Sequence, residues 1–305
     1  MSKFVIGIDF GTLSGRAVLA DAADGRVIAS SEYLYPHGVM DEVLPWGEKV
    51  PSGWALQHPQ DYLDVLTNTV PKIIKDIDPK DIAAIGLDCT SATVLPVNEE
   101  GMPLCFTQEF EQDPYSYIFM WKHHGGQEQA RRMTEKAKGT RILDNYGGIV
   151  NSEWMLPKLL QICDESPKTY KAMAHYVEAV DWLVWKLSGN HTRSAGCLGY
   201  KALFTGKFPG EDYFASLNPE FRNVAQEKLS GALLPLGTAA GKLSPEWAEK
   251  LSLTADTVIA TGNIDAHVCL PAVGIDGPGK LLAIIGTSTC HIVMSDKVLP
   301  VKGMR

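Results

Sequence analysis

The sequence is short of positive charge, long apolar stretches and signals for export. Its 305 residues carry 28 Lys and Arg against 36 Asp and Glu, which gives a formal net charge of −8. Because no basic run or stripe is present, we expect neither nucleic acids nor anionic membrane surfaces as partners. No apolar run approaches the length of a membrane-spanning helix. The opening Met-Ser-Lys lacks the features of a signal peptide, so we expect a cytoplasmic protein.

The cysteines are also scattered, without the C-x-x-C spacing that zinc sites and redox motifs use. Each has apolar neighbours, which favours reduced, buried thiols over disulfides or zinc ligands. These cysteines are Cys89, Cys105, Cys163, Cys197, Cys269 and Cys290.

What remains is an ordinary globular composition, 45% apolar and 21% charged, in a chain long enough for two domains. Strand and helix patterns alternate, as is typical of α/β proteins. Pro71 predicts a kink or break near the end of the first helix. We expect strands at Phe4–Asp9, Arg16–Asp21, Val27–Tyr33 and Thr257–Ala260, and helices at about Pro59–Asp76, Gln127–Lys138, Glu153–Cys163 and Val177–Leu187.

The clearest break in the pattern is GIDGPG, at 274–279. Glycine and proline in such a cluster are typical of a connection. We therefore expect a first domain at 1–275, with 276–305 opening a second one.

The first eighteen patterned residues, FVIGIDFGTLSGRAVLAD, predict a tight hairpin with a small polar turn. The turn has neither the Gly-Lys-Ser/Thr of a P-loop nor a dinucleotide fingerprint. Two interpretations stay open: a plain hairpin, or a turn whose backbone amides, with the hydroxyls of Thr12 and Ser14, cradle a phosphate. Asp9, at the end of the first strand, is either placed to hold Mg²⁺ through water or is a solvated turn residue.

A second stretch, LLAIIGTSTCHIVMSD at 281–296, repeats the first design, with Gly286 and Thr287 at its turn. Two such hairpins favour a duplicated architecture in which two phosphate-binding turns face each other. Chance similarity of two apolar hairpins is the alternative.

Two charged residues are candidates for chemistry. Asp265 follows a strand and a Gly-Asn turn at the start of a helix, where it serves either as a helix cap or as a general base. Lys201, after a run of small residues, either meets an anionic or hydroxylated ligand or faces water.

Aromatic residues next to polar ones form a further group of candidates. Glu153-Trp154 and Asp181-Trp182 suit a sugar site, where rings cover C–H faces and carboxylates bind hydroxyls. Core packing of both tryptophans is the alternative. In MWKHH, at 120–124, the adjacent histidines do not predict a metal site, because neighbouring residues of a helix point apart.

Six stretches taken together resemble the FGGY carbohydrate kinases, along the whole chain and in order. They are GIDFGTLSGRAVLAD, MWKHH, GGIVNSEWMLPKLL, DWLVWKLSG, GNIDAHV and IIGTSTC. The resemblance implies an α/β, actin-like fold of two ribonuclease-H-like domains, with sugar and ATP meeting between them. Family members run well beyond 305 residues. We therefore expect a fragment: the complete first domain and the opening hairpin of the second, inactive by itself.

The resemblance also implies roles for individual residues. Gly11, Thr12, Ser14 and Arg16 would face the ATP phosphates, together with a second turn at Gly286, Thr287 and Ser288. Asp9 would help to hold Mg²⁺, and Asp265 would be the catalytic base. Sugar contacts would come from Ala92, Trp121, Lys122, Glu153, Lys201 and Asp265. His123 stands where many relatives carry Asp, which puts a sugar contact there in doubt.

The implied reaction is phosphoryl transfer from ATP to the terminal hydroxyl, O5, of L-ribulose, as in arabinose catabolism. Two alternatives remain: a kinase of xylulose, glycerol or another polyol, and an actin-like ATPase or assembly module without kinase activity. A homo-oligomer is also left open.

Overall fold

The computed structural model describes residues 3–285 and 289–297. Its largest element is a seven-stranded mixed sheet in the order β11-β12-β5-β1-β2-β3, with β13 also paired to β5. The strands β1, β2 and β3 run antiparallel, whereas β5 is parallel to β1, β12 and β13. The strands are β1 Phe4–Phe10, β2 Ser14–Asp21, β3 Val27–Leu34, β5 Ile82–Cys89, β11 Ala239–Lys242, β12 Val258–Ala260 and β13 Asn263–Ile264.

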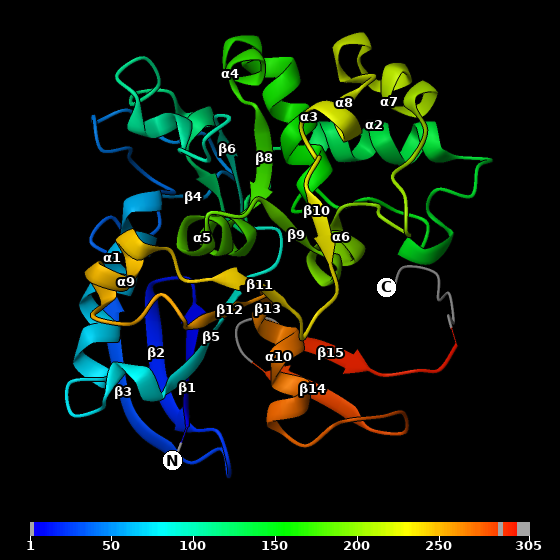
Figure 1. Ribbon diagram of the computed structural model, residues 1–305. Coiled ribbons are helices and arrows are strands. Elements are labelled where there is room, and N and C mark those ends of the chain that lie inside the picture. Colours follow the sequence, from blue (N-terminus) through cyan, green and yellow to red (C-terminus); the bar gives the residue numbers. More distant parts are fainter. Residues whose placement is uncertain (1–2, 286–288, 298–305) are drawn as a thin grey trace.

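Helices cover this sheet unequally. On one face α1, Pro59–Ile73, packs on β2 and β3 and against α9, Pro245–Leu251, while α5, Ala179–Ser188, packs on β5, β11 and β12. On the other face lies α10, Asp265–Ala272, beside β5 and β13 (Figure 1). None of the residues of α10 is fully buried. The face that carries α10 is therefore the open one, where polar side chains can meet ligands.

A second group of elements, drawn above the large sheet in Figure 1, has its own core. Its sheet has the order β4-β7-β6-β8, and aromatic and aliphatic residues such as Phe119, Trp154, Leu159 and Phe221 fill the core around it. The elements are β4 Leu56–Gln57, β6 Val94–Val97, β7 Ile118–Phe119, β8 His175–Glu178, α2 Gln127–Ala137, α3 Met155–Glu165, α4 Pro167–Ala172, α7 Glu211–Leu217 and α8 Val224–Glu227.

Shorter elements complete the chain. β9, Thr192–Ser194, pairs in parallel with β10, Ala232–Leu234, and leads into α6, Ala195–Lys201. β14, Leu281–Ile285, pairs with β15, Thr289–Val293, in a separate two-stranded hairpin. The described helices include none with both the length and the apolarity to cross a bilayer. Short 3-10 helices lie at Pro79–Asp81, Leu104–Phe106, Pro114–Ser116, Asp144–Tyr146 and Pro219–Phe221.

The strands and helices that the sequence predicted are present with bounds that differ by a few residues. Both hairpins are present, and α1 ends soon after Pro71. The helix predicted at Val177–Leu187 is wrong at its start, because Val177 and Glu178 belong to β8 and α5 begins only at Ala179. An apolar run of this kind has the same composition in a buried strand as in a buried helix, so periodicity does not divide it. All six cysteines are free thiols, and four of them are buried.

The first hairpin is built by strict alternation along β1. Ile6, Ile8 and Phe10 are buried in the core under α1, so Asp9, between them, points to the open face of the sheet. The amide of Gly11 donates to the carbonyl of Ser14 at 3.0 Å and closes the turn. The turn after β1 is therefore fixed at the end of the sheet, beside Asp9.

Charged side chains are buried where the two cores meet, at the end of β8. Glu178 is 3% exposed, and its Oε1 has no hydrogen-bond partner among the described residues. Burial raises the pKa of Glu178 to about 8, and the charge of Asp181 adds to the effect. Lys158, Lys201 and Arg193 oppose it, since their positive charges favour the carboxylate. The carboxyl of Glu178 is therefore protonated at neutral pH.

Gly15 marks the closest approach of β2 to α1 and generates a first prediction. A Cβ at Gly15 would lie 2.5 Å from both γ-carbons of Val65. We expect Gly15→Ala to lower the free energy of unfolding by about 1–3 kcal/mol, because the helix must move away from the sheet. Gly86→Ala makes the same change in β5, where a Cβ meets nothing within 4 Å. Chemical denaturation of both variants checks this; equal stabilities would contradict it, and Val65→Ala should restore part of the loss.

Glu178 generates a second prediction, on pH. In the unfolded chain its carboxyl titrates near the ordinary value of 4.5, and in the fold near 8. Because the folded state holds the proton more tightly, this contribution to stability is complete below about pH 4.5 and is lost as the pH rises through about 8. Glu178→Gln should therefore flatten the fall in the free energy of unfolding across that range, measured by denaturant titration. Glu249→Gln, at an exposed position of α9, should leave the slope unchanged.

Candidate active site

Three carboxylates meet at one end of the large sheet. The parallel pairing of β1 with β5 places Asp9 directly opposite Asp88, and the pairing of β13 with β5 places Asn263 on the other side of Asp88. Both aspartates alternate with buried neighbours, so they share the open face. Asp265 follows two residues after Asn263, at the first position of α10. The sheet therefore gathers acids from three segments that are far apart in the sequence.

Asp88 was not singled out from the sequence. Burial raises its pKa to about 8, and the charge of Asp9, a side-chain hydrogen bond with Asp9 and the charge of Asp265 add to the effect. A signal was present: GLDC at 86–89 repeats the Gly-x-Asp of GIDF at 7–10, an acid at the end of an apolar strand. Burial and the neighbouring carboxylates thus favour the protonated form of Asp88.

Asp265 is the first residue of α10 and follows the N-cap Ile264, so the interpretation as a helix cap was wrong, and its role as a general base stays a prediction. Its Oδ1 accepts a hydrogen bond from the amide of Ala266 at 2.6 Å, as a residue at a helix start does. Burial raises the pKa of Asp265 and so does the charge of Asp9, while this amide and the charge of Lys201 lower it. The carboxylate is therefore held in place by the helix and still lies on the open face, among charged groups.

Lys201 does not face water, so that alternative was wrong. Its side chain is 9% exposed, and its Nζ lies 3.8 Å from Oε1 of Glu153. Lys201 ends α6, and Glu153 lies just before α3, so the pair joins α6 to the second group of elements. Together with the charge effect on Asp265, this places the predicted sugar residues Glu153 and Lys201 next to each other and near the predicted base.

Ala92 lies in a turn under steric constraint, directly after β5. Its φ is +56°, in the left-handed region that residues with a Cβ seldom adopt. Its carbonyl accepts a hydrogen bond from Nζ of Lys158 at 2.7 Å, and the same ammonium donates to the carbonyl of Met120 at 2.8 Å. Lys158 is fully buried, which lowers its pKa. This lysine, which was not predicted, ties the turn of Ala92 to the segment of Trp121.

The MWKHH segment contributes side chains with different roles. Trp121 donates from its indole Nε1 to the hydroxyl of Thr12 at 3.0 Å. Lys122 forms a half-exposed ion pair with Asp41 at 2.8 Å. His123 is buried, accepts from the amide of Ala55 at its Nδ1 and bonds Gln161 through its Nε2 at 3.0 Å. Burial lowers the pKa of His123 to about 3, so it is a neutral part of the core, in line with the doubt about a sugar contact there.

In the predicted phosphate turn, several polar groups already have partners on the protein. Ser14 donates to Glu32 at 2.8 Å, and Arg16 forms an ion pair with the same carboxylate at 2.6 Å. The carbonyl of Thr12 accepts from Gln57 at 2.9 Å. The second predicted turn, Gly286, Thr287 and Ser288, lies outside the described residues. The phosphate roles of both turns remain predictions.

The two tryptophans that were candidates for sugar stacking are core residues. Trp154 is 1% exposed and packs against Tyr146. Trp182 is fully buried, and its indole donates to the carbonyl of Gly101 at 2.9 Å. Packing was therefore the correct alternative for both.

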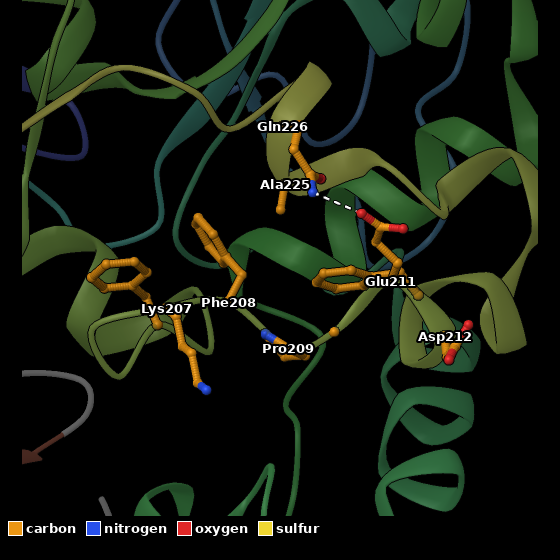
Figure 2. Close-up of a pocket in the computed structure, with 10 residues that line it drawn as sticks. Lys207, Phe208, Pro209, Glu211, Asp212, Ala225 and Gln226 are labelled. Carbon is orange, nitrogen blue, oxygen red and sulfur yellow. Dashed lines mark hydrogen bonds between the residues drawn. The ribbon is translucent and has the colours of Figure 1, made fainter.

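Two other features lie apart from the carboxylates. A hollow of about 690 Å³ lies beside α7 and α8 and is lined by residues that include Phe204, Phe208, Phe214, Lys207 and Glu211. Figure 2 shows the side chains that line it. Among the described residues that line it, none is a predicted site residue. The hollow is an open surface feature, and its location does not coincide with the charged groups described above.

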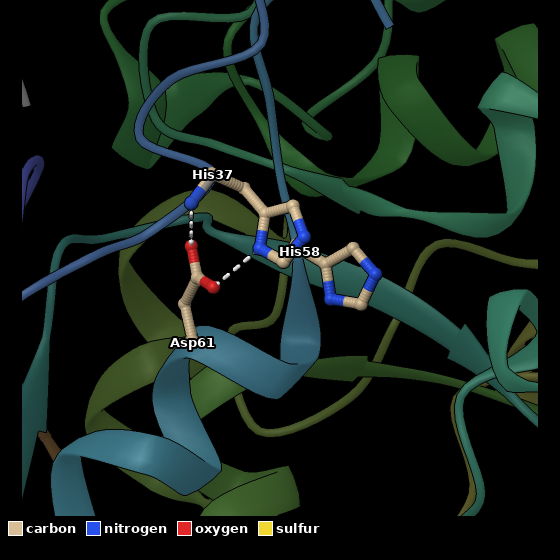
Figure 3. Close-up of side chains that lie close together, drawn as sticks. All are labelled: His37, His58 and Asp61. Carbon is tan, nitrogen blue, oxygen red and sulfur yellow. Dashed lines mark hydrogen bonds and ion pairs between the residues drawn. The ribbon is translucent and has the colours of Figure 1, made fainter. Parts of the chain in front are cut away.

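Figure 3 shows a histidine pair at the start of α1. The rings of His37 and His58 stack at 4.1 Å, and Asp61 accepts from the amide of His37 and bonds its Nδ1 at 2.6 Å. Nδ1 of His58 accepts from the amide of Gln60 and caps the helix. Burial lowers the pKa of His58 to about 4. These hydrogen bonds attach the loop that carries His37 to the start of α1.

Comparisons with known proteins show the family to which the chain belongs. Residues 4–270 match the N-terminal domain of the FGGY family of carbohydrate kinases. The chain is 46% identical to a ribulokinase of Bacillus licheniformis over 96% of this chain and 54% of that protein. It is 42% identical to a ribulokinase of Halalkalibacterium halodurans, over 99% of this chain and 55% of that protein. The chain thus spans about half the length of the curated relatives it matches.

Solved structures give the fold. The xylulose kinase of Rhodospirillum rubrum superposes with a TM-score of 0.75 at 19% identity, over 98% of this chain and 57% of that one. The glycerol kinase of Plasmodium falciparum, solved with ADP, gives 0.74 at 17% identity, over 96% and 54%. The predicted α/β, actin-like fold is confirmed. Because the family's N-terminal domain accounts for residues 4–270, the chain belongs to the FGGY family of carbohydrate kinases.

Proposed function

We propose that this chain is the sugar-binding and catalytic part of an ATP-dependent ribulokinase, which phosphorylates O5 of L-ribulose. The observation that carries the proposal is the meeting of Asp9, Asp88 and Asp265 at one end of the sheet, with the Glu153–Lys201 pair nearby. The ribulokinases among its relatives support the choice of sugar. The activity is proposed for a protein of the relatives' full length that contains this chain.

Asp265 is the proposed general base. A sugar hydroxyl is a poor nucleophile at neutral pH, so a carboxylate must accept its proton as the new P–O bond forms. Burial and Asp9 raise the pKa of Asp265, which makes it a stronger base than a solvated aspartate. Lys201 has the opposite effect and helps to keep the carboxylate ionised. The hydrogen bond from Ala266 leaves one oxygen, Oδ2, for the substrate.

The neighbouring acids fit Mg²⁺. Asp9 and Asp88 offer only oxygen ligands, side by side on adjacent strands, which is the donor type that this cation prefers. When bound, Mg²⁺ would neutralise charge on the phosphates of ATP.

The residues implied by the family resemblance are proposed to bind the sugar and the phosphates of ATP. Ala92, Trp121, Lys122, Glu153 and Lys201 would orient the sugar. Gly11, Thr12, Ser14 and Arg16 would meet the phosphates from one side, and Gly286, Thr287 and Ser288 from the other. Positioning and charge neutralisation of this kind account for most of the catalysis in phosphoryl transfer.

The two domains proposed are 1–275 and 276–305, the latter being the start of a nucleotide-binding domain. Supporting this, Leu281, Ile285 and Val293 of the β14–β15 hairpin are exposed, as expected for a surface that further chain would cover. We further propose a cytoplasmic protein.

The third prediction separates the sugar site from the nucleotide site. If the adenosine pocket lies in a second domain, residues 1–305 should bind L-ribulose weakly and show neither nucleotide affinity nor kinase turnover. Calorimetry with the sugar and with a non-hydrolysable ATP analogue, plus a coupled ADP assay, measures this. Full activity of the 305-residue chain would contradict it.

A panel of ketopentoses and glycerol with the full-length protein tests which sugar is phosphorylated. ATP turnover that needs no sugar but accompanies polymerisation would favour an assembly module instead.

The fourth prediction concerns the base. In the full-length protein, Asp265→Asn should lower kcat by about 10²–10⁴ and leave sugar binding nearly unchanged, because only proton transfer is lost. Steady-state kinetics and calorimetry measure the two effects. Asp276→Asn is the matched control, since this aspartate is exposed in the segment after α10. A kcat within a few-fold of the wild-type value would remove Asp265 from the role.

A further inference from the structure

A hydrogen bond joins the predicted phosphate turn to the predicted sugar site. The indole Nε1 of Trp121 donates to Oγ1 of Thr12 at 3.0 Å, across 109 residues of sequence. Thr12 lies in the turn between β1 and β2, and Trp121 follows β7 in the other sheet. The two residues were assigned to different substrates, so their contact links two functions.

A second hydrogen bond connects the turn between β1 and β2 to the sheet that contains β4 and β7. Gln57, the fully buried last residue of β4, donates from Nε2 to the carbonyl of Thr12 at 2.9 Å. Its Oε1 accepts from the hydroxyl of Tyr62, also at 2.9 Å. The ring of Tyr62 stacks on the rings of Phe10 and Tyr35, with centroid distances of 5.3 and 5.4 Å. Gln57 is therefore fixed, and it holds the backbone of the turn while Trp121 holds the side chain.

The pairing of β4 with β7 connects Gln57 to the segment of Trp121. β4 pairs with β7 through Gln57 and Ile118, and the amide of Met120, next to Trp121, donates to the carbonyl of Ala55 at 3.1 Å. A displacement of this pair of strands therefore moves both partners of Thr12 together.

From this geometry we propose that Trp121 is a positioning residue that couples the sugar site to the phosphate turn. The hydroxyl of Thr12 accepts from the indole and keeps its own proton to donate to a phosphate oxygen. A hydroxyl that accepts one hydrogen bond is a better donor in the next, so the indole strengthens the grip on phosphate. A sugar that contacts the Trp121 ring and holds it against Thr12 then favours ATP binding, and ATP favours sugar binding by the same factor. The inference rests on the proposed function for the assignment of the two sites.

A double-mutant cycle in the full-length protein tests the coupling between the indole of Trp121 and the hydroxyl of Thr12. Trp121→Phe keeps a ring for the sugar but removes the N–H, and Thr12→Val removes the hydroxyl at nearly constant shape. We expect Trp121→Phe to weaken binding of a non-hydrolysable ATP analogue by about 2- to 10-fold, the size of one hydrogen bond. In the Thr12→Val background, the same change should alter that affinity by less than twofold.

Two further variants separate this from a general packing defect. Thr12→Ser retains the hydroxyl and should preserve the full effect of Trp121→Phe. Trp46→Phe is the matched control, because its indole donates to exposed Glu48 and its ring packs on Tyr117. This change should leave both affinities unchanged. Thermal melting of every variant confirms that the fold is intact.

The proposal is overturned if Trp121→Phe weakens only sugar binding, or if its effect on the nucleotide is the same with and without the Thr12 hydroxyl. Failure of the proposed function is a separate result. If no ketopentose is phosphorylated, the function is wrong, while the cycle measured on nucleotide affinity still reports whether the indole supports the phosphate turn.

Discussion

The register of β1 against β5 determines the rest of the site. Because these strands run parallel, their carboxyl ends lie at the same edge, and Asp9 falls opposite Asp88. A shift of one residue would turn either aspartate into the core under α1. The short strand β13 then needs to pair with β5 for only two residues to bring Asp265 to the same edge. Strand pairing, rather than any loop, thus sets the geometry of the acids.

Burial of charge is the cost of this arrangement, and cations on the second group of elements offset it. Lys201 acts on Asp265 and on Glu178, and Lys158 acts on Glu178 from α3. Burial still dominates, so the pKa values of Asp88, Glu178 and Asp265 are all raised. Lys158 is itself held by two backbone carbonyls. The region between the two cores is therefore polar but fully constrained, which suits a site that must hold its groups in place before the substrate arrives.

The sequence predicted those features that depend on a short stretch of consecutive residues. The β1–β2 hairpin and Asp265 were found because a strand end followed by a turn is visible in a short window. Asp88 had the same pattern and was passed over. Lys158 and Gln57 could not have been found, because each acts on backbone groups 38 to 66 residues away, and a lysine or glutamine in an apolar helix or strand carries no sign of its partner. The same holds for Trp121, whose bond to Thr12 depends on how two sheets meet.

The β14–β15 hairpin has a consequence for handling the protein. It pairs with no other strand of the described residues, so both of its edges present open backbone groups, and Leu281, Ile285 and Val293 are exposed beside them. Open edges next to apolar side chains are the usual route to strand-by-strand association between molecules. Residues 1–305 should therefore aggregate as the protein concentration rises, through pairing of the β14–β15 hairpins of different molecules. The well-packed body of the domain should stay folded within the aggregate.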